Sequence, residues 1–287
     1  MDNSSYLEAY LEMVDLRNLA DHTRRSYKTY ISAYLAYLEK QGLSPEDAGW
    51  KEIRAYLLYI KKERNLSDRT INAATSQIRF FTEYVLRREW DERQVPMRKY
   101  DVYLPFVPSR DMVCEFINSI ESLKDRTIIT LMYSCGLRVS EVCALKYEDV
   151  SRKEHLLHIR HSKNRTDRYV PLSDTALNML TRYWFEYGRP ENVLFPRPSD
   201  PDHPIYNQYV QILIARQEEK TGWPHRLTPH SFRHAFATHV YEQTKDLLLV
   251  QKILGHKSIA STSIYVHLAE VKQFPFANPL DEMEVSV

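Results

Sequence analysis

Hydrophobic side chains recur every three or four positions through residues 1–93, which is the period of an α-helix with one buried face. The clearest run is 24–39, where this spacing repeats at Tyr27, Tyr30, Ile31, Tyr34, Leu35 and Leu38. Asp21 predicts the cap that starts this helix, and Gly42 predicts its end. Two more helices are predicted, at 50–62 and 67–88. Residues 1–93 are therefore predicted to form a helical domain.

The helical pattern breaks in the segment 94–108. Pro96, Pro105 and Pro108 fall within 13 residues, and each removes a backbone donor that a helix needs. We interpret this segment as a linker and expect a second domain at 109–270. Its helices are predicted at about 109–121, 124–134, 173–187, 205–221, 230–243 and 246–253.

Residues 155–172 have a different pattern. A run rich in leucine, isoleucine and histidine is followed by the polar stretch 163–167 and then by Arg-Tyr-Val-Pro-Leu. The order of strand, polar turn and strand is typical of a β-hairpin. The chain is thus predicted to be mainly α with a small antiparallel β-sheet, divided between two domains.

Composition is that of a globular protein. The chain has 287 residues, of which 43% are hydrophobic and 27% charged, enough for two domains with their own cores. It has no apolar run long enough to span a membrane and no secretory signal at its start, so we expect a cytoplasmic protein without a membrane partner. Cys114, Cys135 and Cys143 lack metal-ligand spacing and are expected to be free thiols.

Five residues in the predicted second domain form a candidate chemical set: Arg138, His230, Arg233, His256 and Tyr265. A phenol can attack phosphorus, and cations can neutralise the charge that develops, so this set can break a phosphodiester without a metal. A lone His-x-x-Arg has little specificity. The full order is far harder to obtain by chance, with 23 positions from Arg233 to His256 and 9 from His256 to Tyr265.

The set lies in the motifs Cys-Gly-Leu-Arg-Val-Ser-Glu, Pro-His-Ser-Phe-Arg-His-Ala-Phe-Ala-Thr-His, Leu-Gly-His-Lys-Ser and Ile-Tyr-Val-His. Together these resemble the tyrosine recombinase or phage integrase family, most closely its compact Xer-like and transposon-integrase members. The resemblance implies a DNA-binding, core-binding domain at 1–93 and a catalytic domain at 109–270, which form a C-shaped clamp on duplex DNA. It also implies that the tail 271–287 is exchanged with a neighbouring subunit.

Tyr265 is the predicted nucleophile. Only about one phenol in a thousand is ionised at pH 7, so it needs cationic neighbours or a base. The resemblance implies that attack leaves a 3′-phosphotyrosyl link and a free 5′-hydroxyl. Arg138 and Arg233 are predicted to hold the two non-bridging oxygens, because a planar guanidinium matches the geometry of phosphate. No cofactor is expected.

His230 and His256 are predicted to donate to the same oxygens or to handle the tyrosine proton, since histidine titrates near neutral pH. The resemblance of the hairpin selects Lys163 as the general acid for the leaving hydroxyl. Glu141, three residues after the first arginine, is predicted to orient the cations. His230 and His234 have the spacing of a zinc pair, but no third ligand is evident and no metal site is expected.

Six basic residues are predicted to meet the DNA backbone, with an ordinary solvated surface as the alternative: Arg24, Arg25, Lys28, Arg69, Arg79 and Arg165. The net charge of +1 is low for a DNA-binding protein. Charge is uneven, however, because 138–170 holds eight Lys and Arg against five Asp and Glu. We expect binding to be weak in high salt.

We therefore expect a site-specific DNA recombinase that forms a tetramer on its recombination sites and exchanges strands through a Holliday junction. Two alternatives stay open: a nicking and closing enzyme like type IB topoisomerases, and an inactive DNA-binding accessory factor. The expected role is integration or transposition of a mobile element, or Xer-type dimer resolution. A paralogue or accessory protein is an open alternative to self-assembly, and the target sequence is not predicted. Such an enzyme is expected in the cytoplasm, associated with the nucleoid.

Overall fold

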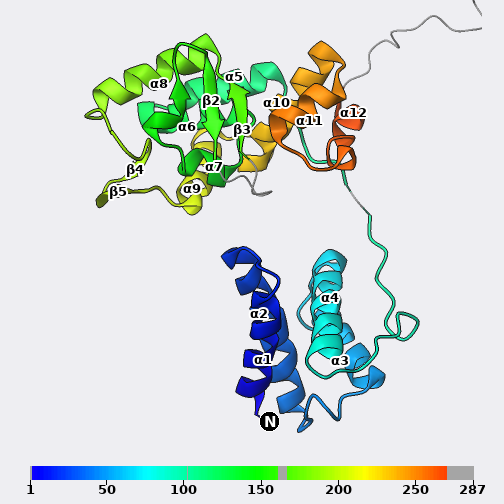
Figure 1. Cartoon of the computed structure of the whole chain (residues 1–287). Helices are drawn as coiled ribbons and strands as arrows, with labels where there is room; N and C mark the ends of the chain where they lie inside the picture. The colour runs from blue at the N-terminus through cyan, green and yellow to red at the C-terminus, as the bar shows by residue number, and fades with distance from the viewer. Residues whose placement is uncertain (1, 102, 161–166, 270–287) are drawn as a thin grey trace, which may run out of the picture. The chain divides into compact units, whose positions relative to one another are not determined.

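The computed structural model describes residues 2–101, 103–160 and 167–269 (Figure 1). The chain divides into two compact units, Met1–Tyr103 and Leu104–Val287. The division lies inside the segment predicted as a linker. The first part of that segment packs on the first unit, since Val95 is buried and Arg98 pairs with Asp68. Its prolines exclude a helix but allow an extended segment that docks on a domain.

The described part of the first unit contains α1 (Asn3–Asp15), α2 (Asp21–Lys40), α3 (Trp50–Lys62) and α4 (Asp68–Tyr84) (Figure 1). The apolar faces of these helices meet in a core where Tyr10, Leu38 and Phe81 are fully buried. The three predicted helices are confirmed, although the third ends at Tyr84 and not near Arg88, and α1 was not predicted separately. The predicted cap at Asp21 is wrong, because the N-cap residue is Ala20. Asp21 lies in the first turn instead, where a carboxylate interacts favourably with the helix dipole.

The described part of the second unit is mainly helical and carries short antiparallel strands. Its elements are α5 (Arg110–Ser119), α6 (Leu123–Ser134), α7 (Val139–Cys143), β1 (Val150–Ser151), β2 (Leu156–Ile159), β3 (Arg168–Pro171), α8 (Asp174–Glu186), β4 (Pro196–Arg197), β5 (Asp200–Pro204), α9 (Asn207–Thr221), α10 (Pro229–Thr244), α11 (Leu247–Leu254) and α12 (Ile264–Leu268). The prediction of a mainly helical chain with small antiparallel sheets is confirmed. Among the described residues, no helix is long and apolar enough to cross a membrane.

The predicted hairpin is present as β2 and β3. They pair antiparallel with Leu157 opposite Val170, and β1 adds a short edge to give the order β1-β2-β3. The second sheet, β4 with β5, was not predicted. Its segment carries Pro196 and Pro204, which are poor strand formers and tolerated at sheet edges.

Helix α6 anchors the core of the second unit. Its residues Ile128, Ile129, Leu131 and Met132 are fully buried, and the helix packs against α8 and α10. Helix α10 contributes Phe232 and Ala235 to the same core. Anchoring on that side holds the neighbouring residues of α10 at fixed positions, and those residues include the predicted His-x-x-Arg pair.

Gly136 lies in the turn that connects α6 to Arg138. Its φ is +61°, and a Cβ placed there would lie 2.5 Å from Cδ1 of Phe236 and 3.0 Å from Cδ2 of Leu254. The left-handed conformation costs a non-glycine residue about 1–2 kcal/mol. The clash adds an overpacking cost of about 1–3 kcal/mol.

We therefore expect Gly136→Ala to destabilise the second unit by roughly 2–5 kcal/mol, the sum of these two costs. Gly222→Ala is the matched control, since Gly222 has φ +65° with nothing within 4 Å of its Cβ position. It should show the conformational cost alone. Hydrogen exchange during urea unfolding measures the free energy of unfolding of the second unit in both variants. Equal losses of stability would show that the clash contributes nothing.

Candidate active site

Four of the predicted residues come together from four elements of the second unit. Arg138 is the N-cap residue of α7, Arg233 lies on α10, His256 follows α11, and Tyr265 lies on α12. An Arg233 Nη atom lies 3.2 Å from Nε2 of His256, and the rings of His256 and Tyr265 stack with centroids 6.4 Å apart. Residues far apart in the sequence thus form one cluster.

The remaining members of the predicted set differ in what the structure describes. His230 lies on α10 one turn before His234, with ring centroids 6.2 Å apart. Lys163 and Arg165 lie outside the described residues. The tail 271–287 lies outside them too. The predicted roles of Lys163, Arg165 and the tail therefore stay predictions.

Glu141 joins the cations, as predicted from its spacing. The residue is 7% exposed, and its carboxylate accepts a hydrogen bond of 2.7 Å from the Arg138 guanidinium and one of 2.9 Å from the Arg138 backbone N–H. Arg233 approaches the same carboxylate to 3.8 Å. The carboxylate therefore fixes the orientation of both predicted phosphate ligands.

Arg168, which the sequence analysis did not select, is the strongest partner of Glu141. It donates to both carboxylate oxygens, at 2.9 and 2.8 Å, and its Nε donates to the Ile253 carbonyl at 2.8 Å. The sequence contains a pattern that could have identified Arg168. Arg168 shares the face of β3 with the buried Val170, because strand side chains alternate with period two.

The charge on Glu141 is strongly favoured in this arrangement. Burial raises the pKa of its carboxyl, but the hydrogen bonds and charge of Arg168, with those of Arg138, outweigh burial and hold the pKa at about 2. A bidentate guanidinium pair of this kind is both strong and directional. Glu141 is therefore ionised throughout the physiological pH range.

Arg233 is held by the backbone as well. It is 3% exposed and donates to the carbonyls of Gly136 and Leu254 at 2.5 and 2.7 Å. The Leu254 carbonyl belongs to the C-terminus of α11, where a helix dipole favours a cation. Burial and the neighbouring Arg138 lower the pKa of Arg233 to about 10, so the guanidinium stays charged at pH 7.

The hydrogen bonds of His256 show which of its ring nitrogens carries the proton. Arginine can only donate, so Nε2 of His256 must accept from Arg233. The ring proton then lies on Nδ1, which donates to Oγ1 of Thr262 at 3.0 Å. Burial, together with the charge of Arg233, lowers the pKa of His256 to about 4. His256 is therefore neutral at pH 7 in the unliganded protein.

Tyr265 is covered. Its side chain is 1% exposed, and its hydroxyl lies 3.2 Å from Nδ1 of His234 in a hydrogen bond. Burial raises the pKa of the phenol above its usual value, and Arg233 and Arg138 offset only part of that rise. The arrangement holds a protonated phenol beside a cluster of cations.

The cluster is rich in cations, with three guanidinium groups around one carboxylate. Within the described ranges, no three His, Cys, Asp or Glu side chains are placed to hold a metal. Arg138 has a side chain 15% exposed, the most open of the three arginines around Glu141. A phosphate could approach that side of the cluster, whereas Arg168 and Arg233 are enclosed.

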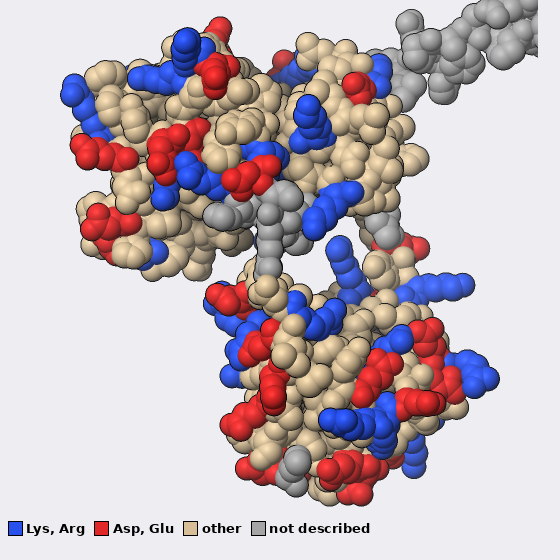
Figure 2. All heavy atoms as spheres, in the orientation of Figure 1, with Lys and Arg blue, Asp and Glu red and all other residues tan. Residues whose placement is uncertain are grey.

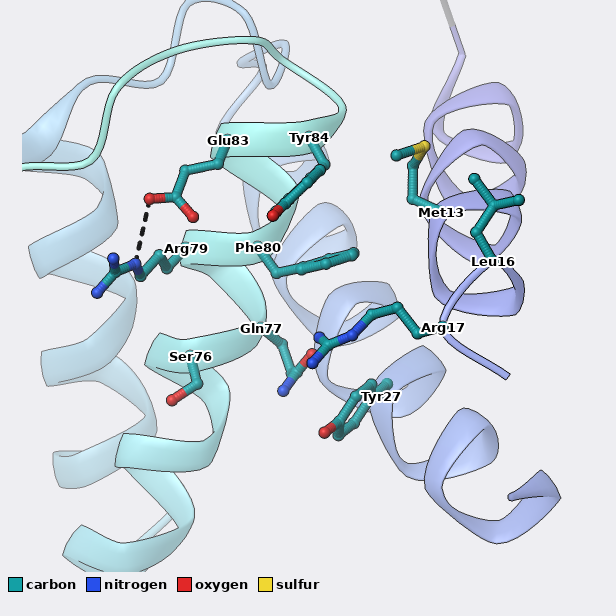
Figure 3. A pocket seen from close by; sticks show the side chains of 10 residues that line it. All are labelled: Met13, Leu16, Arg17, Tyr27, Ser76, Gln77, Arg79, Phe80, Glu83 and Tyr84. Carbon is teal, nitrogen blue, oxygen red and sulfur yellow. Dashed lines mark hydrogen bonds and ion pairs between the residues drawn. The ribbon is translucent and has the colours of Figure 1, made fainter. Parts of the chain in front are cut away.

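The basic residues of the first unit differ in their pairing. Arg24 pairs with Asp15 at 2.6 Å, and Arg79 pairs with Glu83 on the next turn of α4 (Figure 3) and with Glu92. Arg25, Lys28 and Arg69 make no ion pair within the part of the chain that the structure describes. Exposed pairs are worth about 0.2–1 kcal/mol, so a phosphate can replace the carboxylate.

The surface charges are mixed. Figure 2 shows Lys and Arg side chains interspersed with Asp and Glu on the face in view of each unit. This agrees with the net charge of +1. DNA binding by such a surface depends on a few well-placed cations and not on a broad basic field.

Comparison with known proteins shows to which family this chain is similar. Residues 110–272 match the phage integrase family, and residues 6–92 match the phage integrase N-terminal SAM-like domain. The integrase/recombinase y4qK of Sinorhizobium fredii is 33% identical, over 94% of this chain and 86% of that protein. Tyrosine recombinase XerD of Pseudomonas aeruginosa is 32% identical, over 89% of this chain and 90% of that protein.

Solved structures share the fold. A lambda integrase dimer bound to a COC′ core site has a TM-score of 0.74 at 20% identity, covering 96% of this chain and 99% of that one. XerH recombinase bound to its difH substrate before cleavage has a TM-score of 0.71 at 20% identity, covering 85% of this chain and 77% of that one. Sequence and fold agree, and the chain belongs to the phage integrase family of tyrosine recombinases.

Proposed function

We propose that this protein is a site-specific DNA recombinase that cleaves and rejoins duplex DNA through Tyr265. The observation that carries the proposal is the placement of the Tyr265 phenol near Arg138 and Arg233, two of the three guanidinium groups gathered by Glu141. Rigid cations favour a phosphoryl transition state because they are oriented before the charge develops. The names of the relatives, which include XerD and XerA tyrosine recombinases, support the same function.

In the proposed reaction, the Tyr265 oxygen attacks a DNA phosphorus and the bond from phosphorus to O5′ breaks. The phenolic proton leaves Tyr265, and the departing O5′ takes up a proton, for which Lys163 is the proposed donor. Arg138 would bind one non-bridging oxygen, and Arg233, which is enclosed in the unliganded protein, would bind the other once the site opens. The phosphodiester becomes a 3′-phosphotyrosyl ester of similar energy, so rejoining requires no nucleotide cofactor.

His256 would change role when DNA binds. The phosphate brings negative charge next to the imidazole and so favours its protonated form. A protonated ring can donate from Nε2 to a phosphate oxygen, whereas the neutral ring accepts from Arg233 there. His230 is proposed as a second donor to the same phosphate.

We further propose that the DNA-binding domain comprises 1–93, the linker 94–108 and the catalytic domain 109–270, with 271–287 exchanged between subunits. The matched ranges 6–92 and 110–272 support these limits.

Four protomers on two sites would exchange strands through a Holliday junction, on DNA in the nucleoid. Integration of a mobile element is the favoured role, and dimer resolution is the alternative.

A covalent trap tests the proposed function. The protein is incubated in EDTA with nicked duplexes made from the sequences that flank its own gene, and SDS-resistant protein–DNA complexes are sought. We expect a complex whose proteolysis yields a nucleotide-linked peptide containing Tyr265, because metal-free attack by the phenol leaves that bond. A complex that requires a divalent metal, or one linked through another residue, would contradict the proposal. Relaxation of supercoils without site preference would favour the topoisomerase-like alternative.

A further inference from the structure

The residue after Arg233 is placed to act on Tyr265. His234 and Tyr265 face each other from α10 and α12, with ring centroids 5.7 Å apart and Nδ1 3.2 Å from the hydroxyl. Helices α10 and α12 pack together, and Tyr265 is 1% exposed. Bulk water therefore has almost no access to the hydroxyl, and the protein itself must supply the group that takes its proton.

The other histidine beside Tyr265 cannot do so in this arrangement. Both ring nitrogens of His256 are engaged, one accepting from Arg233 and one donating to Thr262. It has no lone pair left for the phenol. Nδ1 of His234, in contrast, is already in hydrogen-bond contact with the oxygen that loses the proton. A general base must have this contact before its pKa matters.

We propose that His234 is the catalytic base that accepts the phenolic proton when Tyr265 attacks DNA. The assignment rests on the proposed function. As the bond from the Tyr265 oxygen to phosphorus forms and the bond to O5′ breaks, the proton moves from the phenol to Nδ1 of His234. In the rejoining step, the same proton returns to the phenol as it leaves phosphorus. The proton on the departing O5′ comes from a separate donor.

The groups around His234 keep its imidazole neutral, which is the form that can accept a proton. Burial lowers its pKa to about 4, with His230 and Arg233 acting in the same direction. The charged and titratable groups around it are His230 and Arg233 on α10, Tyr265 on α12 and His256 after α11. His234 is therefore neutral above about pH 5, with a lone pair on Nδ1 for the phenolic proton, although a pKa this low makes it a weak base. A phosphate bound at the cluster would stabilise the cation formed.

His234→Asn tests the assignment, because the amide can accept a hydrogen bond but cannot take a proton near neutral pH. The control is His239→Asn. His239 lies on the same helix, is buried, and its Nδ1 bonds a different phenol, Tyr133, at 3.0 Å. Single-turnover cleavage is measured from pH 6 to 9 on a flank duplex whose scissile O5′ is replaced by sulfur. A thiolate leaves without a proton, so the rate reports on the base alone.

We expect His234→Asn to cleave about 10²–10⁴-fold more slowly at pH 7, the usual contribution of a general base. Its rate should rise about tenfold per pH unit as hydroxide replaces the base, while the wild type stays nearly flat. His239→Asn should follow the wild type in rate and pH profile. A loss that is the same at every pH would indicate a structural role and overturn the assignment, as would an unchanged rate.

A second measurement needs neither cleavage nor a variant. Nitrogen-15 NMR of the wild-type protein at pH 7 should show the His234 proton on Nε2 and a bare Nδ1, and a proton on Nδ1 would overturn the assignment. The two proposals fail differently. If the wild type forms no covalent complex on any flank duplex, the proposed function fails and the assignment falls with it. If the wild type cleaves and His234→Asn matches it, only the assignment fails.

Discussion

Tyr265→Phe is expected to abolish the covalent protein–DNA complex while leaving the fold and DNA binding in place. The ring that fills the site is retained, and only the attacking oxygen is removed. Loss of the nucleophile in a well-studied protease costs about 10⁶ in rate, and here a phenyl ring offers no oxygen from which the bond can form. Stability should change little, since one hydrogen bond contributes about 0.5–1.5 kcal/mol.

The matched control is Tyr133→Phe. Tyr133 also bonds a histidine on α10, His239, at 3.0 Å, but lies outside the cluster. It should retain cleavage close to that of the wild type. The measurement is SDS-resistant complex on a nicked duplex, with gel-shift binding in parallel. A complex that persists in Tyr265→Phe would mean that another residue is the nucleophile.

Glu141→Gln is expected to destabilise the second unit by about 3–5 kcal/mol, the usual cost of removing one partner of a buried ion pair. The carboxylate is 7% exposed and accepts from Arg138 and Arg168, with Arg233 nearby. Glutamine keeps the shape but leaves these cations without their shared anion, and its amide N–H group faces other donors. Hydrogen exchange during urea unfolding measures the loss in the second unit.

The control is Glu186→Gln, since Glu186 pairs with Arg182 at 2.6 Å on the surface of α8. That change should cost less than about 1 kcal/mol. The pH dependence supplies a further check. The pKa of Glu141 lies at about 2, below its ordinary 4.5, so its stabilisation is present above pH 4.5 and is lost as the pH falls towards 2. Glu141→Gln should lack this acid loss, and equal costs for both variants would contradict the argument.

The sequence predicted the helices and the hairpin because their periodicities reflect local preferences. Short elements were missed. Helix α12 has only five residues, and its position depends on packing against α10. The strands β4 and β5 contain prolines that argue against a strand when read locally. The cap at Asp21 was wrong because one carboxylate can suit either an N-cap or a first turn.

The candidate site shows the same limit. Arg138, Arg233, His256 and Tyr265 were selected by motif, and the structure brings them together. His234 and Arg168 act, or are proposed to act, through contacts between segments distant in sequence. Alternation along β3 carried a signal for Arg168, whereas nothing in the sequence pattern tells which histidine of α10 faces the phenol. The predicted clamp of two domains around DNA stays a prediction.

The covered position of Tyr265 has a consequence for fidelity. Opening the site enough to admit a phosphate, with the hydrogen bond between Tyr265 and His234 kept, costs at most about 1.5–3 kcal/mol, the value for fully exposing a hydrophobic side chain of this size. Each 1.4 kcal/mol corresponds to a factor of about ten in an equilibrium. If the proposed function holds, a DNA contact that does not open the site leaves the nucleophile enclosed. A cost of this size lowers cleavage at a chance DNA contact by about ten- to a hundredfold, and the contacts made by the complete site must offset it.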